Sequence, residues 1–154
     1  MKSRILKLNV VFLLFLFIGA SCQNDEDDIY GKIKIKDFNY VGCKDENAFE
    51  KSAYTEIIEF KADGNYLAIR HVDVYFNCCF DELITNVELD STSIVFTEDE
   101  TGPGCDCICK YDIECKIGPL EYGEYLFVLK RSTRIKSEFK LLFNSLTDST
   151  HIIN

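Results

Sequence analysis

The stretch Cys105-Asp106-Cys107-Ile108-Cys109-Lys110-Tyr111-Asp112-Ile113-Glu114-Cys115-Lys116-Ile117 decides the fold class. Every odd position in it is a cysteine, a tyrosine or an isoleucine, and every even position except Ile108 is charged. Successive side chains of a β-strand point to opposite faces, whereas a helix would scatter these two groups around its circumference. The stretch therefore predicts a strand with one apolar, sulfur-rich face and one charged face in contact with water.

Period-two patterns recur from residue 30 to the end of the chain. Isoleucines alternate with lysines over residues 30–41, which suits an edge strand, and residues 125–129 are apolar on both faces, which suits a central one. Asp63-Gly64 between two apolar runs predicts a β-hairpin, and a change of apolar phase near Arg70-His71 predicts a bulge. Further strands are expected around residues 83–89, 94–96, 139–143 and 152–153.

Helical periodicity is almost absent, apart from a short turn that we expect over residues 43–52 with Asp45 as its cap. Turn signals separate about eight strands at intervals of about 8 to 12 residues. This spacing is typical of sandwiches and barrels, and we favour the sandwich. The sequence therefore predicts an all-β fold, a single antiparallel β-sandwich over residues 30–154.

The first 21 residues have the organisation of an export signal. A short apolar run over residues 10–20 is too short to span a bilayer as a helix, and it follows a basic segment formed by Lys2, Arg4 and Lys7. The small residues Gly19-Ala20-Ser21 stand directly before Cys22, and with the preceding segments they resemble a bacterial lipoprotein signal peptide. The resemblance implies cleavage after residue 21 and fatty acylation of Cys22, which would anchor the chain in a membrane.

Residues 22–29 form an acidic tether that contains Asp25-Glu26-Asp27-Asp28. The tether is similar to the acidic export signal of Bacteroidetes surface lipoproteins, and this resemblance implies the outer leaflet of the outer membrane. The alternative is a solvated linker on a domain that faces the periplasm. The Cys-x-Cys-x-Cys-x-Tyr-Asp motif at 105–112 also resembles small Bacteroidetes lipoproteins, and Gly-x-Tyr-x-Phe-x-Leu at 123–129 is similar to immunoglobulin-like and transthyretin-like sandwiches.

Seven cysteines follow Cys22, and an exported chain is expected to pair them in disulfides. Cysteines two apart on a strand have Cα atoms about 6.5 to 7 Å apart, at or beyond the disulfide limit. We therefore expect three cysteines of the opening stretch to bond outside it: Cys105, Cys107 and Cys109 with Cys43, Cys78 and Cys79. Cys115, between two isoleucines of the same face, is the candidate for a buried free thiol.

Metal binding and catalysis are the less favoured interpretations. A tetrahedral thiolate site needs sulfurs about 3.8 Å apart, and alternate residues of a flat strand hold them farther apart. His71 and Asp73 share a predicted strand face, but such a pair is more typical of a surface contact than of a catalytic site. The sequence contains neither Gly-x-Ser-x-Gly nor His-Glu-x-x-His, so we expect no cofactor, no metal and no enzymatic activity.

The charge excludes some partners and leaves others open. Loss of the leader's basic residues takes the formal charge from −9 to about −12, which disfavours nucleic acid. We expect a non-enzymatic envelope lipoprotein that binds or shields a protein or a glycan. Four tyrosines offer an aromatic platform for the latter: Tyr40, Tyr54, Tyr66 and Tyr75. The alternatives are a cysteine-based metal or redox protein, and a small inhibitor or immunity-type lipoprotein.

Overall fold

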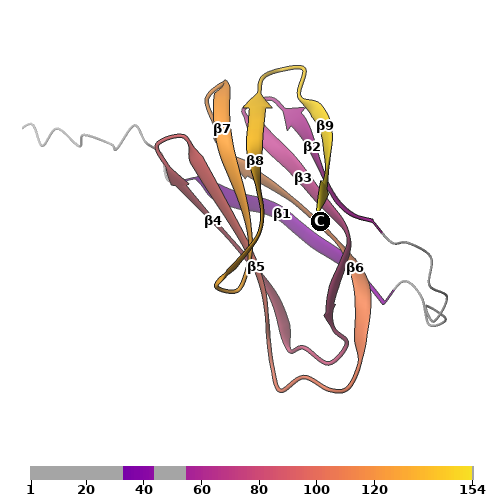
Figure 1. Ribbon diagram of the computed structural model, residues 1–154. Helices are drawn as coiled ribbons and strands as arrows, with labels where there is room; N and C mark the ends of the chain where they lie inside the picture. Colours follow the sequence, from indigo (N-terminus) through magenta and orange to yellow (C-terminus); the bar gives the residue numbers. More distant parts are fainter. Residues whose placement is uncertain (1–32, 44–54, 154) are drawn as a thin grey trace, which may run out of the picture. The chain divides into compact units, whose positions relative to one another are not determined.

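The computed structural model describes residues 33–43 and 55–153, which form two packed β-sheets (Figure 1). The expected signal peptide, the lipidation site Cys22, the acidic tether and the helical turn capped by Asp45 lie outside the described residues. Nine strands are present in the described part of the chain, and the predicted all-β sandwich is confirmed.

One sheet has five strands in the order β1-β6-β3-β2-β9, and the other has four in the order β4-β5-β7-β8. The five-stranded sheet is formed by β1 (Lys34–Gly42), β6 (Ile108–Gly118), β3 (Tyr66–Asn77), β2 (Glu56–Asp63) and β9 (Asp148–Ile153). The four-stranded sheet is formed by β4 (Glu82–Asp90), β5 (Ser93–Thr101), β7 (Gly123–Arg131) and β8 (Arg134–Phe143).

The expectation of a fully antiparallel sandwich was wrong at one pair of strands. β5 and β7 run parallel, with Ile94 opposite Phe127 and Phe96 opposite Leu129, whereas all other strand pairs in the described residues are antiparallel. The chain leaves the four-stranded sheet after β5, forms β6 in the other sheet and returns, and such a crossover permits a parallel neighbour. β7 is a central strand, as residues 125–129 predicted.

The predicted hairpin and bulge are both present on β3. β2 and β3 pair from Ile57 opposite Val72 to Asp63 opposite Tyr66, and Gly64 in the intervening turn has a φ of 62°. The pairing of β3 with β6 shifts between His71 and Val74. Asp73, inside the shift, has a φ of 60°, which is uncommon for a residue other than glycine. The phase change near Arg70-His71 therefore marks a real bulge.

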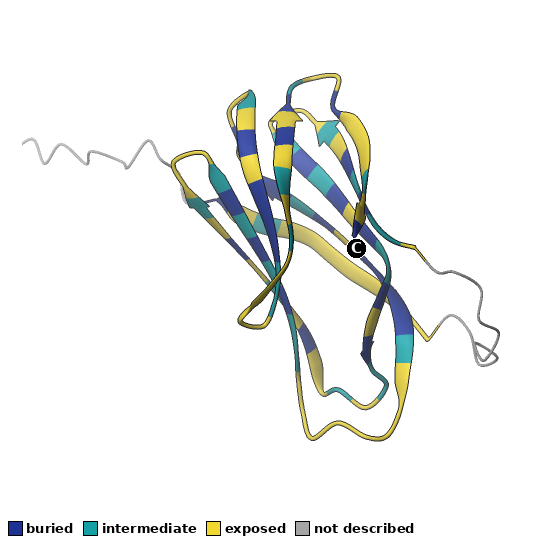
Figure 2. Cartoon of the chain, in the orientation of Figure 1, coloured by how far each residue is buried: buried dark blue, intermediate teal, exposed yellow. Residues whose placement is uncertain are grey.

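Phenylalanines fill the space between the two sheets. The ring centroid of Phe127 in β7 lies 4.9 Å from that of Phe60 in β2, 5.4 Å from that of Phe139 and 6.1 Å from that of Phe96. Phe60, Phe96 and Phe127 are fully buried or nearly so. A smaller apolar cluster, with Phe76 and Tyr111 among its members, lies beside the beginning of β6. β1 is exposed over most of its length, as an edge strand with lysines should be (Figure 2).

The opening stretch differs from its prediction in two respects. β6 begins at Ile108, so Cys105 and Cys107 lie in the segment before the strand, which follows two glycines with positive φ, Gly102 and Gly104. The even-numbered, charged positions of the stretch are not all exposed to solvent either, because Lys110 and Asp112 are only 4% and 7% exposed. β6 lies between β1 and β3, and the side chains of these neighbours cover positions that a single strand would leave open.

Candidate functional site

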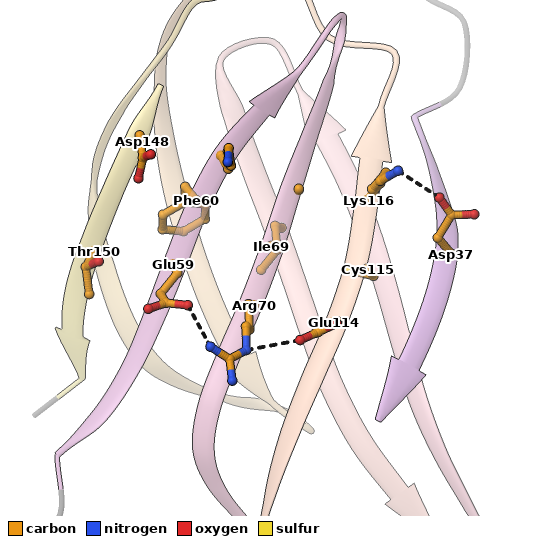
Figure 3. A pocket seen from close by; sticks show the side chains of 12 residues that line it. Asp37, Glu59, Phe60, Ile69, Arg70, Glu114, Cys115, Lys116, Asp148 and Thr150 are labelled. Carbon is orange, nitrogen blue, oxygen red and sulfur yellow. Dashed lines mark hydrogen bonds and ion pairs between the residues drawn. The ribbon is translucent and has the colours of Figure 1, made fainter. Parts of the chain in front are cut away.

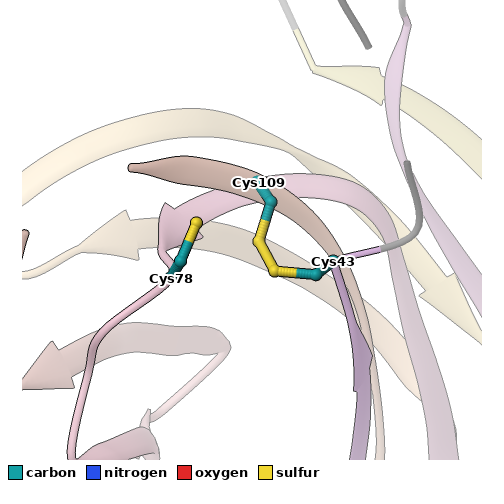
Figure 4. Close-up of side chains that lie close together, drawn as sticks. All are labelled: Cys43, Cys78 and Cys109. Carbon is teal, nitrogen blue, oxygen red and sulfur yellow. A yellow bond between two sulfur atoms is a disulfide. The ribbon is translucent and has the colours of Figure 1, made fainter. Parts of the chain in front are cut away.

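Three disulfides join β6 and the segment before it to the residues that follow β1 and β3; Figure 4 shows the Cys43–Cys109 bridge beside Cys78. They link Cys43 to Cys109, Cys78 to Cys107 and Cys79 to Cys105, with Cα–Cα distances of 5.0, 5.4 and 5.6 Å. Cys43 directly follows β1, and Cys78 and Cys79 follow β3. The sequence had predicted that each cysteine of one group reaches across to the other group, and the structure supplies the pairing that the sequence left open.

Asn77 at the end of β3 holds the segment before β6 in place. Its side-chain oxygen accepts hydrogen bonds from the backbone nitrogens of Cys79 and Cys105 at 2.8 and 3.0 Å, and its Nδ2 donates to the Cys105 carbonyl at 2.6 Å. The backbone nitrogen of Cys78 donates to the Cys107 carbonyl at 3.1 Å. These hydrogen bonds act beside the disulfides in holding the two groups of cysteines together.

Cys115 is the free cysteine among the described residues, and it is 3% exposed. Burial, together with the charge of Glu98, raises the pKa of its thiol to about 12. The thiol is therefore protonated at neutral pH, and a protonated thiol is a poor nucleophile. Cys115 acts as a small apolar side chain in the core.

The three described tyrosines of this set, Tyr40, Tyr66 and Tyr75, do not form a single platform. Tyr40 packs against Phe80 and Tyr111, whereas Lys36 lies over the ring of Tyr66 with Nζ 4.3 Å from its centroid. Tyr66 and Tyr75 stand at opposite ends of β3, about 30 Å apart at the usual rise of a strand. Tyr54 lies outside the described residues.

A depression of about 480 Å³ lies over the five-stranded sheet (Figure 3). Alternate residues of β2, β3 and β6 point outward here, and the short side chain of Ala68 leaves room between longer ones. Its other lining residues include charged groups of both signs: Asp37, Glu59, Lys61, Arg70, Glu114, Lys116 and Asp148. We refer to these residues and Ala68 as the charged face.

Carboxylates on both sides fix Arg70, the central cation of the charged face. Its guanidinium contacts Glu59 at 3.2 Å, Asp112 at 3.0 Å and Glu114 at 3.0 Å. Burial alone would lower the pKa of Arg70, but the neighbouring carboxylates raise it. Asp112 also accepts a hydrogen bond from the backbone nitrogen of Asp73 at 3.1 Å, so the bulge of β3 helps to position this cation.

Lys116 provides a second fixed cation. Its Nζ lies 2.9 Å from Asp63 and 3.1 Å from Asp37, and these hydrogen bonds raise its pKa. The charged face therefore contains two cations, Arg70 and Lys116, that are each paired with more than one carboxylate.

His71 is buried, and the expectation of a surface contact with Asp73 was wrong. Its Nδ1 lies 2.9 Å from Glu98 of β5, its Nε2 lies 3.0 Å from Glu56, and the ring is 1% exposed. The bulge between His71 and Val74 breaks the alternation that would have given His71 and Asp73 the same face. Since both ring nitrogens are occupied, His71 links the two sheets and is not poised as a catalytic base.

Burial and neighbouring charges shift the pKa values of the groups around His71 in opposite directions. Burial would lower the pKa of His71, but the charge of Glu98 and the hydrogen bonds with Glu56 and Glu98 raise it to about 9. Burial alone would raise the pKa of Glu56, but the hydrogen bond with His71, together with the positive charges of His71, Lys136 and Arg131, lowers it overall. Arg131 lies nearby with its guanidinium 3.4 Å from the centroid of Phe76; burial lowers its pKa, and the carboxylates partly oppose this shift.

The sequence did not reveal this buried cluster. His71 and Glu98 are 27 residues apart and belong to different sheets, and Glu98 follows the buried apolar residues Ile94 and Phe96 on the same face of β5. The one signal in the sequence was Glu98, a charged residue at a position that alternation places on the same strand face as Ile94 and Phe96.

Within residues 33–43 and 55–153, no helix has the length and apolar character needed to cross a membrane. Comparison of the chain with protein-family models, with curated proteins and with solved structures gives no match.

The disulfides are expected to contribute unequally to stability. Replacing Cys43 and Cys109 by Ala opens the bridge with a sequence separation of 66 and should cost about 4 kcal/mol in the free energy of unfolding. Replacing Cys79 and Cys105 should cost about 1 kcal/mol or less, because their 26-residue separation lies inside the loop that Cys78–Cys107 already closes. Urea unfolding of both double variants measures the difference, and equal losses would contradict it.

Stability is expected to fall as the pH rises above neutrality. Because the pKa of His71 is raised from 6.5 to about 9, its contribution is fully present below pH 6.5 and is lost as the pH rises through 9, about 3 kcal/mol in total. The lowered pKa of Glu56 gives a contribution that is lost in acid, below pH 4.5. Chemical unfolding at pH 6 and pH 9 measures the alkaline loss.

His71→Gln should be less stable at pH 6 and should show little of this alkaline loss. His151→Gln is the matched control, because His151 stacks on Phe139 with ring centroids 3.7 Å apart and lies near the Ser137 hydroxyl. A loss of the same size in His71→Gln and in the unmodified protein would assign the pH dependence to other groups.

Proposed function

We propose that the protein is a non-enzymatic lipoprotein of the cell envelope, anchored through Cys22, which binds a partner on the charged face of its sandwich. The partner is an extended polar segment of a protein or a glycan at the outer membrane. The observation that carries the proposal is the depression over the five-stranded sheet with its two fixed cations.

The disulfides support the location. Three bridges in a domain of this size are typical of proteins that fold in an oxidising compartment. The leader before Cys22 resembles a lipoprotein signal, and the acidic tether after it resembles a surface-export signal. A domain at the cell surface also benefits from cross-links that resist unfolding.

The geometry of the charged face supports binding. A volume of about 480 Å³ lies in the range of ligand sites, about 300 to 1,000 Å³. Since carboxylates already hold Arg70 and Lys116 in place, a partner would lose less free energy in ordering these side chains. Charges of both signs favour a partner that offers donors and acceptors over a simple anion.

The chemistry of the candidate catalytic groups supports a role without catalysis. The imidazole of His71 bonds to carboxylates through both nitrogens, and the thiol of Cys115 is buried and protonated. His71 does not line the depression, and Cys115, which does, is a buried member of the core with its thiol protonated. Binding therefore explains the charged face better than turnover does.

A photo-reactive amino acid placed at Ala68 should cross-link a discrete partner on intact cells. The control position is Thr97, which alternates with buried Phe96 and Glu98 and so faces outward from the other sheet. Adding Arg70→Ala should abolish the product, whereas Lys140→Ala should not, because Lys140 pairs with Glu124 on the four-stranded sheet. Equal products from the two probe positions, or a product that survives Arg70→Ala, would count against this surface.

A separate experiment tests the lipid anchor. Cys22→Ala should abolish labelling with a fatty acid analogue and release the chain from the membrane fraction, because acyl chains supply the attachment. Cys115→Ala is the control and should keep both. Retention of the label in Cys22→Ala would overturn the lipoprotein assignment without affecting the charged face.

A further inference from the structure

Two cross-strand rows of the charged face have opposite charge patterns. Both rows run across β2, β3 and β6 in direct register. The Arg70 row consists of Glu59, Arg70 and Glu114, and the Ala68 row consists of Lys61, Ala68 and Lys116. All of these residues line the depression (Figure 3). Carboxylates therefore flank the centre of one row, and ammonium groups flank the centre of the next.

The Arg70 row has an excess of negative charge. Arg70 contacts three carboxylates, one of which belongs to Asp112, whose side chain is 10% exposed. The side chains of Glu59 and Glu114 are 39% and 54% exposed, and each uses one oxygen in its contact with Arg70. The second oxygen of each has no hydrogen bond or ion pair within residues 33–43 and 55–153. These two acceptors are open to a cation from a partner.

The Ala68 row offers the opposite charge. Lys61 lies opposite Asp148 in the pairing of β2 with β9, but it makes no ion pair with any residue that the structure describes. The ammonium of Lys116 contacts two carboxylates, which leaves one of its three N–H donors. The short side chain of Ala68 lies between these lysines in the register. A carboxylate can therefore enter over Ala68, with Lys61 as its main partner.

The separation of the two rows matches that of alternate residues in an extended chain. Arg70 and Ala68 are two residues apart on β3, which corresponds to about 6.5 to 7 Å. Side chains i and i+2 of an extended segment point to the same side with the same separation. A segment that runs along β3 can therefore place one side chain over each row.

We propose that the charged face binds an extended protein segment that carries Lys or Arg at one position and Asp or Glu two positions away. The cation of the segment donates to the second oxygens of Glu59 and Glu114, and its carboxylate accepts from Lys61 and Lys116. This inference rests on the proposed function, because it names the chemistry of the partner at the same site.

Other partners match the face less well. A purely basic segment would meet the lysines of the Ala68 row, and an acidic segment or acidic glycan would meet the carboxylates of the Arg70 row. For a neutral glycan, one face of the neighbouring Tyr66 ring is already covered, because Lys36 Nζ lies 4.3 Å from its centroid. A segment with both charges satisfies both rows.

Titration of the purified protein with short capped peptides, followed by NMR of the backbone amides, tests the inference. A threonine peptide with Lys and Glu two positions apart should shift the amides of β2, β3 and β6 and reach saturation. A peptide of the same composition with Lys and Glu adjacent should bind more weakly, because adjacent side chains point to opposite faces. Equal binding of the two peptides, or no saturable shift on these strands, would overturn the inference.

A charge reversal provides the matched comparison. Lys61→Glu should weaken binding of the Lys/Glu peptide by about 5-fold, the upper value for an exposed ion pair, and should prefer a peptide with Lys at both positions. Lys140→Glu lies on the four-stranded sheet and is the control, so it should keep the preference of the unmodified protein. An unchanged preference in Lys61→Glu would contradict the proposed pairing.

The inference and the proposed function can fail separately. If the cross-link from Ala68 forms on cells and depends on Arg70, but the captured partner survives protease digestion, the binding surface stands and the protein segment is wrong. If no cross-link forms but the Lys/Glu peptide binds with the expected dependence on spacing, the proposed function fails and the charge preference of the face stands.

Discussion

The placement of β6 between β1 and β3 is the constraint on which the rest of the structure depends. Hydrogen bonds hold this strand along both edges, and the disulfides join the region where it begins to the ends of both neighbours. One face of β6 delivers Ile113, Cys115 and Ile117 to the core. The other face carries the charged residues that meet Arg70 and the bulge of β3. The core, the cross-links and the charged face therefore all depend on β6.

Local pattern sufficed for most of the architecture. Period-two alternation identified the strands, lysines identified the edge strand β1, and a change of phase identified the bulge near His71. The limit on Cα separation sufficed to send the cysteines of the opening stretch toward Cys43, Cys78 and Cys79. Each of these predictions depends on the spacing of residues along one strand or between cysteines, and this spacing can be read directly from the sequence.

What the sequence could not predict depends on neighbours that are distant in the chain. Lys110 and Asp112 are buried because β3 supplies Asp73 and Arg70 at its bulge. The parallel pairing of β5 with β7 requires β6 to cross to the other sheet. His71 pairs with Glu98 across the core, and a single-strand pattern carries no information on such a partner.

These features divide the domain by role. The buried His71 cluster ties the two sheets together, the disulfides secure the beginning of β6, and the charged face is the surface left for recognition. Stability and binding rest on different residues of the same sheet. Variants of the charged face can therefore change partner binding while the cross-links and the core remain in place.

Disulfide mapping of the native protein tests the central claim most directly. Digestion without reduction, followed by electron-transfer fragmentation, should yield three bridges, Cys43–Cys109, Cys78–Cys107 and Cys79–Cys105. Cys115 should react with an alkylating agent only after denaturation, because it is buried. A bridge within the opening stretch, or rapid labelling of Cys115 in the folded protein, would contradict the placement of β6 from which the account follows.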